Sequence, residues 1–222
     1  MPSWWVAEVW SVSPAALLFW VFWVIVSILL HELAHGWAAV RLGDSTPYDT
    51  GHMTWNPLVH MGPFSLIAFA LVGIAWGAMP IDPSRIRGRH GEAIVAAAGP
   101  AMNLVLFAFC VVLAGVWALA EPHLPGHYAA NLHLFARVGA TLSLVLAIFN
   151  LVPVPPLDGS RIAASFIPEY RRLFESENGQ WIGLIGFMLL FAVGSDYIFA
   201  AAGSVSGAVL DAVTGWLGQS PA

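Results

Sequence analysis

The sequence contains no lysine, a single cysteine and few charged residues of any kind. Its eight basic residues are all arginines, and charged residues make up only 9% of the 222 positions. A soluble domain usually carries about 25% charged residues, so a chain this poor in charge could not cover a water-facing surface. The lone Cys110 excludes an intrachain disulfide and a zinc site built from cysteines. The arginines form no basic patch of the kind that binds nucleic acid, so no nucleic-acid partner is expected.

Hydrophobic residues, by contrast, make up 59% of the chain. A membrane-spanning helix needs ~20 apolar residues, so the length has room for about five or six such segments. We expect them at about 15–40, 64–79, 93–120 and 132–152, with one or two more within 181–217. A short interfacial helix is expected within 162–180. The sequence thus predicts an all-α polytopic membrane protein with a single domain over 1–222 and a core at about 15–165.

The sharpest motif is His31-Glu32-Leu33-Ala34-His35, an H-E-x-x-H pattern inside the first apolar segment. Residues four apart lie on one face of an α-helix, so both imidazoles can reach the same metal ion. Glu32, beside them, is placed to act on a water in the open position of that ion. Ionisable groups at membrane depth are costly and are functional by default. The pattern therefore predicts a metal site rather than a chance match.

Two histidines do not complete a zinc site, because catalytic zinc usually has three protein ligands. The chain continues after His35 without the further histidine of the long zincin motif. Asp158 stands out because it follows an apolar segment and lies between two prolines and a glycine, where the backbone cannot be simple helix. From spacing alone, a helix N-cap explains Asp158 equally well. The other acidic candidates are Glu92, Glu121, Glu169, Glu175, Glu177 and Asp196.

Three motifs occur in the order found in a known family. They are HELAHGW at 31–37, AAAGPAMN at 96–103 and FNLVPVPPLDGSR at 149–161. With them the sequence resembles the site-2 protease family of intramembrane zinc metalloproteases over about residues 25–165. The loop WNPLVH (55–60) is similar to one found in a compact bacterial branch of that family. The sequence contains neither the PDZ nor the CBS domain of larger relatives, which fits that branch.

The resemblance implies roles for the residues that match these motifs. His31, His35 and Asp158 are then the ligands of one Zn²⁺ ion per chain, and Glu32 is the general base. Asn150 matches a family asparagine that holds the substrate or stabilises the oxyanion. Asn103 matches the asparagine of the second motif, for which we expect a role of the same kind.

One loop departs from the family pattern. Residues 60–63 read His-Met-Gly-Pro, where the family has an aspartate before the proline, so no role is carried over to this loop. His52 and His60 lie in the loop closest to the predicted site, where they would gate it or bind a second metal. Solvated or hydrogen-bonded loop histidines are the alternative for both.

A shared metal places a constraint on the topology. The histidines and Asp158 lie at the C-terminal ends of the first and fourth segments, so those two segments must run in the same direction. Four successive crossings would make them antiparallel. The conflict disappears if the second segment, Phe64–Met79, is re-entrant and does not cross. It is short, it contains two glycines, and prolines flank it.

The arginines give an independent indication of the same topology. With a re-entrant second segment, all of them except Arg137 fall on one side of the membrane. Cytoplasmic loops carry an excess of basic residues, so the active site is expected to open to the cytoplasm. The residues on that side are Arg41, Arg85, Arg87, Arg89, Arg161, Arg171 and Arg172.

The sequence thus predicts an intramembrane zinc metalloprotease that cuts peptide bonds within or near transmembrane segments of membrane proteins. A substrate helix hides its peptide bonds and must first unwind. A small β-hairpin with an exposed edge, at about 48–56, is therefore expected near the site to pair with the unwound segment. By resemblance, the substrates are single-pass proteins, such as anti-sigma factors or signal-peptide remnants, in a bacterial inner membrane.

Three other functions are compatible with parts of the pattern. A membrane zinc protease of another lineage would take a glutamate as third ligand, such as Glu169 or Glu175. A catalytically silent homologue would bind transmembrane helices without cutting them, but it has no need for a buried Glu32. A metal transporter would need a relay of acidic residues through the other segments, which the sequence lacks.

Overall fold

The computed structural model describes residues 4–120 and 126–218, and every regular element among them is helical. Four helices are long and apolar enough to cross a membrane. A fifth apolar helix, Pro57–Val72, is shorter. The predicted all-α polytopic architecture is therefore confirmed, with five hydrophobic segments in the described part of the chain. The four long helices are Pro14–Arg41, Gly91–Ala120, Tyr128–Leu151 and Asn178–Leu217.

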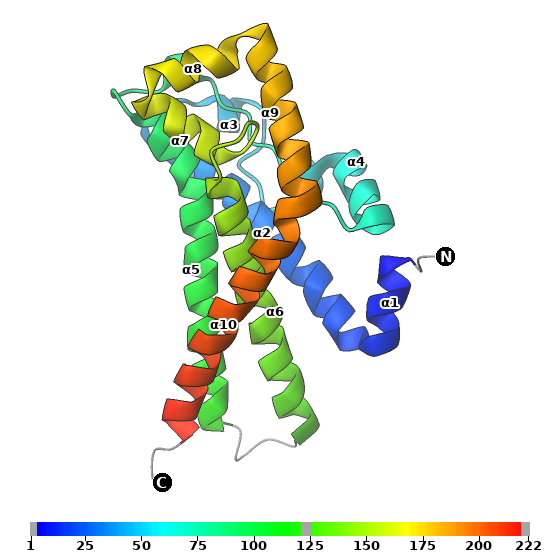
Figure 1. Ribbon diagram of the computed structural model, residues 1–222. Helices are drawn as coiled ribbons and strands as arrows, with labels where there is room; N and C mark the ends of the chain where they lie inside the picture. Colours follow the sequence, from blue (N-terminus) through cyan, green and yellow to red (C-terminus); the bar gives the residue numbers. More distant parts are fainter. Residues whose placement is uncertain (1–3, 121–125, 219–222) are drawn as a thin grey trace.

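The first long helix, α2 (Pro14–Arg41), carries the H-E-x-x-H motif. Ser13 caps its start, because the hydroxyl oxygen accepts a hydrogen bond from the Ala16 N–H at 3.1 Å. Proline fits the first helical position, where no N–H partner is needed. At ~1.5 Å per residue, the motif lies about 9–15 Å before the end of the helix, well within the apolar part of the fold. The shorter α1 (Trp5–Val12) packs back against α2 (Figure 1).

Helices α5 (Gly91–Ala120) and α6 (Gly126–Leu151) pack against α2 to form the central bundle. Figure 1 shows that α2 and α6 run in the same direction and that α5 runs in the opposite one. Ala136 and Ala140 are fully buried on α6, and small residues of this kind let membrane helices approach closely. Trp23 of α2 donates its indole N–H to the Phe135 carbonyl of α6 at 3.0 Å. The expected common direction of the first and fourth segments is thus observed.

The second apolar segment enters the fold as a helix and returns as extended chain. Helix α4 (Pro57–Val72) begins after Asn56, whose side-chain oxygen accepts from the Leu58 N–H at 3.0 Å, and it kinks at Gly62. It ends at Gly73, which has the left-handed conformation (φ 77°) that favours glycine. Residues 74–82, which we call the returning segment, follow the bend at Gly73 and have no regular secondary structure.

Hydrogen bonds show that the returning segment runs back along α4. The Ser65 hydroxyl donates to the Trp76 carbonyl at 2.7 Å and accepts from the Trp76 N–H at 2.8 Å. Further along, the Ala78 N–H donates to the carbonyl of His60 at 2.9 Å. Residues later in the chain thus pair with residues progressively earlier in α4. The second segment therefore returns along α4, as the predicted re-entrant path requires, although its helix begins at Pro57 rather than Phe64.

The β-hairpin expected at about 48–56 is absent, and the described residues contain no strand. The loop instead contains the one-turn helix α3 (Thr46–Asp49), followed by turns. Pro47 lies in the first turn of α3, where its fixed φ favours helix and its missing N–H would weaken a strand. The expectation of a strand here was wrong because local side-chain hydrogen bonds and this proline favour a helical turn.

The C-terminal region is one long helical arm rather than two hydrophobic segments. Helices α9 (Glu177–Leu189) and α10 (Ser195–Gly218) are joined through the π-helical turn η3 (Leu190–Gly194). Thr141 and Ser206 share a 2.8 Å hydrogen bond between α6 and α10. These contacts attach the arm to the bundle, and Figure 1 shows it crossing the bundle obliquely.

Two short helices and a 3-10 turn complete the described part of the fold. Helices α7 (Asp158–Phe166) and α8 (Pro168–Glu175) occupy the region where a short helix was predicted. They lie at the end of the bundle where α5 begins (Figure 1). The turn η1 (Pro83–Arg85) belongs to the loop before α5. The Arg87 N–H donates to the Leu42 carbonyl at 2.9 Å, so the basic loop before α5 contacts the end of α2. Arg137, eleven residues into α6, pairs with Asp211 of α10 at 2.7 Å.

The re-entrant path predicts the sidedness of three positions. We expect Asn56→Cys and Ser84→Cys to react with an impermeant thiol reagent from one side of the membrane, because both flank the re-entrant segment. Ala120→Cys, at the far end of α5, should react from the other side. Labelling of sealed vesicles measures this in a Cys110→Ala background. Asn56 and Ser84 on opposite sides would contradict the re-entrant path.

Candidate metal centre

Two helices bring three side chains to one point. His31 and His35 lie one turn apart on α2, and Asp158 is the first residue of α7. The two Nε2 atoms are 3.0 Å apart, and they lie 3.1 and 3.3 Å from the Asp158 Oδ2 atom. Of the described residues, these three are the group with the geometry to hold a metal ion. The spacing of residues in the sequence did not decide which acidic residue is the third ligand. Of the candidates, Asp158 is the one that lies beside the two histidines.

The hydrogen bonds behind the imidazoles indicate that Nδ1 of each ring carries a hydrogen. His35 Nδ1 lies 2.7 Å from the Val95 carbonyl, which only accepts, so Nδ1 is the donor. His31 Nδ1 lies 2.6 Å from Asn103 Oδ1, while the amide nitrogen of Asn103 donates to the Ser27 carbonyl at 3.4 Å. Nδ1 is thus engaged in both rings, which leaves Nε2 as the ring nitrogen that faces the Asp158 carboxylate.

Two ring nitrogens and one carboxylate oxygen converge at a spacing that suits a bound cation. Asp158 Oδ2 is buried and accepts no hydrogen bond among the described residues. Two ligands about 2.0–2.1 Å from a tetrahedral ion lie about 3.3–3.4 Å apart, close to the spacing of these atoms. Two imidazoles and one carboxylate are also a donor set that suits catalytic zinc, which keeps a further position for water. The residues present therefore fit a zinc ion.

Helix α5 leaves room for such an ion because residue 99 is glycine. A Cβ atom at Gly99 would lie 2.4 Å from His35 Nε2 and 2.5 Å from His31 Nε2. Any side chain there would occupy the space into which the ligand atoms point. The AAAGPAMN motif predicted no role for Gly99. The signal was the Gly-Pro pair inside an apolar helix, a place where glycine usually has a packing or functional reason.

Glu32 and Asn150 line the same cavity as the three ligand candidates, and the cavity has a volume of about 240 Å³. Glu32 is 8% exposed, and the returning segment passes directly over it at Gly77, where a Cβ atom would lie 2.6 Å from Glu32 Oε1. The amide nitrogen of Asn150 donates to the Leu146 carbonyl at 3.1 Å. Arg161, an exposed residue of α7, also borders the cavity.

Asn103 does not lie where it could hold a substrate or stabilise an oxyanion, which is the role expected for it. It is fully buried behind His31 and does not line the cavity, so it has no access to a substrate. Its contacts to His31 and Ser27 orient the imidazole instead. Such second-layer partners set the tautomer and direction of a metal-binding histidine.

His52 and His60 lie near each other, but they do not form a metal site with a third side chain among the described residues. Their ring centroids are 6.2 Å apart. His60 is buried and its Nε2–H donates to the Thr54 carbonyl at 2.8 Å, while His52 Nδ1 contacts Thr50. The described residues contain no third ligand beside this pair. Among the acidic alternatives, Glu92 pairs with Arg171 at 3.7 Å, and Glu121 lies outside the described residues.

The protein combines an H-E-x-x-H pair, an aspartate placed as a third ligand and a buried glutamate around one cavity. This is the layout of a metal-dependent hydrolase. Comparison with known proteins agrees. Residues 113–193 match the model of peptidase family M50. YwhC of Bacillus subtilis (strain 168) is 35% identical over 179 residues, covering 77% of this chain and 78% of that protein.

Two further relatives are proteins named Rip2. That of Mycolicibacterium smegmatis is 32% identical over 175 residues, covering 75% of this chain and 64% of the relative. That of Mycobacterium tuberculosis (strain H37Rv) is 27% identical over 207 residues, covering 82% and 76%. YwhC and both Rip2 proteins carry the name "putative zinc metalloprotease". No solved structure gives a significant match.

The chain therefore belongs to peptidase family M50, the site-2 protease family. It is a zinc metalloprotease, as its family and its donor set both indicate.

Whether zinc binding needs the open space at residue 99 can be tested without changing a candidate ligand. We expect Gly99→Ala to reduce bound zinc from about one ion per chain to near zero, because the new methyl group collides with both Nε2 atoms. Gly203→Ala is the matched control, since a Cβ atom there meets nothing within 4 Å. Metal analysis of the purified proteins gives the zinc content, and circular dichroism checks the helices. Full zinc in Gly99→Ala would disprove the assigned location.

The role of Asn103 makes a different prediction. Asn103→Ala should weaken zinc binding by about 10–100-fold, because His31 loses the partner that fixes its tautomer. Competition with a chelator measures the affinity. Asn150→Ala, on the open side of the cavity, should leave zinc affinity unchanged. Equal affinities in the Asn103 variant and the wild type would show that Asn103 does not orient the ligand.

Proposed function

We propose that this protein is an intramembrane protease that hydrolyses peptide bonds within or near transmembrane segments of membrane proteins. One observation carries the proposal: three potential metal ligands from α2 and α7 converge beside a buried glutamate, at the depth of an apolar helical bundle. In this proposal His31, His35 and Asp158 are the zinc ligands, and Glu32 is the general base.

The residues around the cavity divide the chemistry among them. When bound, zinc supplies a Lewis acid that polarises the scissile carbonyl and activates water. Glu32 takes a proton from the attacking water and then passes it to the leaving amine. Asn150 faces the same cavity, and its amide nitrogen has a second hydrogen beyond the one bonded to Leu146. That N–H is the proposed donor to the developing oxyanion.

The substrate enters as an extended chain, because a helix would hide its peptide bonds. The returning segment offers a backbone edge for it. The N–H groups of Gly77 and Met79 make no hydrogen bond among the described residues, whereas those of Trp76 and Ala78 face α4 and are paired. An extended peptide can pair with such an edge by main-chain hydrogen bonds. Gly77–Ile81 thus replaces residues 48–56 as the proposed strand-like edge.

The arginine pattern supports a site that opens to the cytoplasm. Seven arginines belong to the end of α2, the loop before α5, and helices α7 and α8, whereas Arg137 lies in the opposite half of α6. Basic residues accumulate on the cytoplasmic side of a membrane. The relatives come from bacteria, so we place the protein in a bacterial inner membrane. Single-pass proteins such as anti-sigma factors or signal-peptide remnants are its proposed substrates.

Separate variants can distinguish catalysis from metal binding. Glu32→Gln should retain zinc but lose at least about 10²–10⁴-fold in cleavage of a reconstituted transmembrane substrate, because the general base is gone. Asp158→Ala should lose both zinc and cleavage. Metal analysis and gel-based cleavage assays on the same preparations measure the two properties.

The control is Glu169→Gln, an exposed change on α8 away from the cavity, which should behave as the wild type. A wild-type protein that binds zinc and transmembrane peptides but cuts none of them would favour the silent homologue. Zinc retained in full by Asp158→Ala would assign the third ligand elsewhere.

A further inference from the structure

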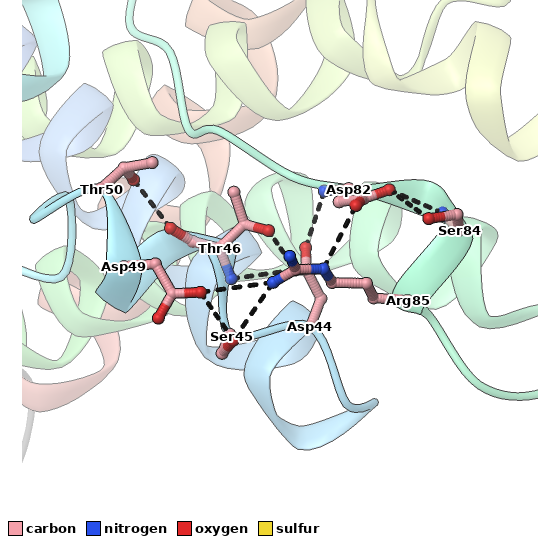
Figure 2. Close-up of polar contacts among 8 residues, drawn as sticks. All are labelled: Asp44, Ser45, Thr46, Asp49, Thr50, Asp82, Ser84 and Arg85. Atoms are coloured by element: carbon pink, nitrogen blue, oxygen red, sulfur yellow. Dashed lines mark hydrogen bonds and ion pairs between the residues drawn. The ribbon is translucent and has the colours of Figure 1, made fainter.

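A carboxylate outside the metal centre is completely buried. Asp44 lies three residues beyond the end of α2 and has no exposed surface. Its Oδ1 atom accepts hydrogen bonds from the Thr46 N–H at 2.9 Å and the Thr46 hydroxyl at 2.5 Å. Its Oδ2 atom accepts from the Asp82 N–H at 2.8 Å. Figure 2 shows the Asp44 side chain between these two partners.

Asp44 is an anion at neutral pH. Burial by itself raises the pKa of a carboxyl group, but the hydrogen bonds from Thr46 and Asp82 outweigh it and hold the pKa of Asp44 below its usual range. A buried charge is tolerated when hydrogen bonds compensate for lost water, and three donors meet that need here. The ionised form is also the form in which both oxygens accept.

The hydrogen bond to Asp82 connects two distant parts of the chain. Asp44 follows the helix that carries the histidines, and Asp82 is the last residue of the returning segment, 38 positions later. The other end of the segment is held by the fully buried Ser65, which bonds both backbone groups of Trp76. The chain between these anchors passes Glu32 and lines the metal cavity.

We propose that Asp44 is a positioning residue for the active site, whose carboxylate fixes the returning segment against α2 so that Gly77–Ile81 keep their register over the cavity. The inference rests on the proposed function, because the register matters for a substrate that pairs with this edge. Asp44 itself touches neither the cavity nor the ligand atoms. Its effect on cleavage therefore passes through residues 77–82.

The same cluster contains a matched control. Asp49 is also an acidic residue close to Asp44, but its side chain is 58% exposed and, within the described part of the chain, pairs only with Ser45 and Arg85. Exposed ion pairs of this kind contribute little to stability. Asp49→Asn changes the same charge without touching the returning segment. Asp44→Asn, in contrast, turns one acceptor oxygen into an amide donor that faces another N–H group.

The test compares full-length wild type, Asp44→Asn and Asp49→Asn in detergent. Hydrogen exchange read by mass spectrometry should be at least about tenfold faster over residues 76–82 in Asp44→Asn, because a hydrogen bond to a charged group is lost. Cleavage of a transmembrane substrate should fall by about tenfold or more, while zinc content stays at the wild-type level. Asp49→Asn should match the wild type in all three measurements.

Each other result has a defined meaning. Unchanged exchange over 76–82 in Asp44→Asn would overturn the proposal, and so would a loss of zinc, because Asp44 would then act on α2. Wild type that shows no cleavage would refute the proposed function, while the exchange data would still decide the role of Asp44. If Asp44→Asn does not fold, the wild type suffices: rapid exchange of the Asp82 N–H would disprove the inference, and protection beside fast-exchanging Gly77 and Met79 would support it.

Discussion

The fold depends on one constraint: three candidate metal ligands from distant parts of the chain must meet at one point. The facing atoms of His31, His35 and Asp158 lie within 3.3 Å of one another, although 123 positions separate the second histidine from the aspartate. Their meeting requires the ends of α2 and α6 at one depth, so these helices must run in the same direction. With α5 between them in sequence, the second apolar segment cannot cross. The metal chemistry thus determines the re-entrant path of α4.

Helix α5 supplies what surrounds the ligands rather than a ligand. The Val95 carbonyl and the Asn103 amide fix the two imidazole tautomers, and Gly99 keeps the space in front of them open. Successive positions of this set are four residues apart, so all three lie on one face of α5. Orientation and space are as necessary to a metal centre as the ligand atoms themselves.

The sequence was informative where a pattern is local, and uninformative where a role depends on distant contacts. The histidine spacing in α2 and the prolines around Asp158 pointed to the metal centre, and segment length with arginine placement pointed to the re-entrant path. The strand expected at 48–56 failed because Pro47 and the Asp44 side chain stabilise a helical turn. The position of Asn103 behind His31, and the bond from Asp44 to Asp82, join residues 72 and 38 positions apart. No motif or periodicity encodes such pairs.

The returning segment has a consequence for hydration. Its Gly77 and Met79 N–H groups lie at the level of the apolar bundle with no protein partner among the described residues. An unpaired backbone group in a hydrocarbon environment costs several kcal/mol, so irregular backbone at this depth occurs only beside protein or water. The cavity must therefore be wet in the resting enzyme. In the proposed function, an arriving peptide replaces water on these groups, and the water that hydrolysis consumes is already in the cavity before the substrate arrives.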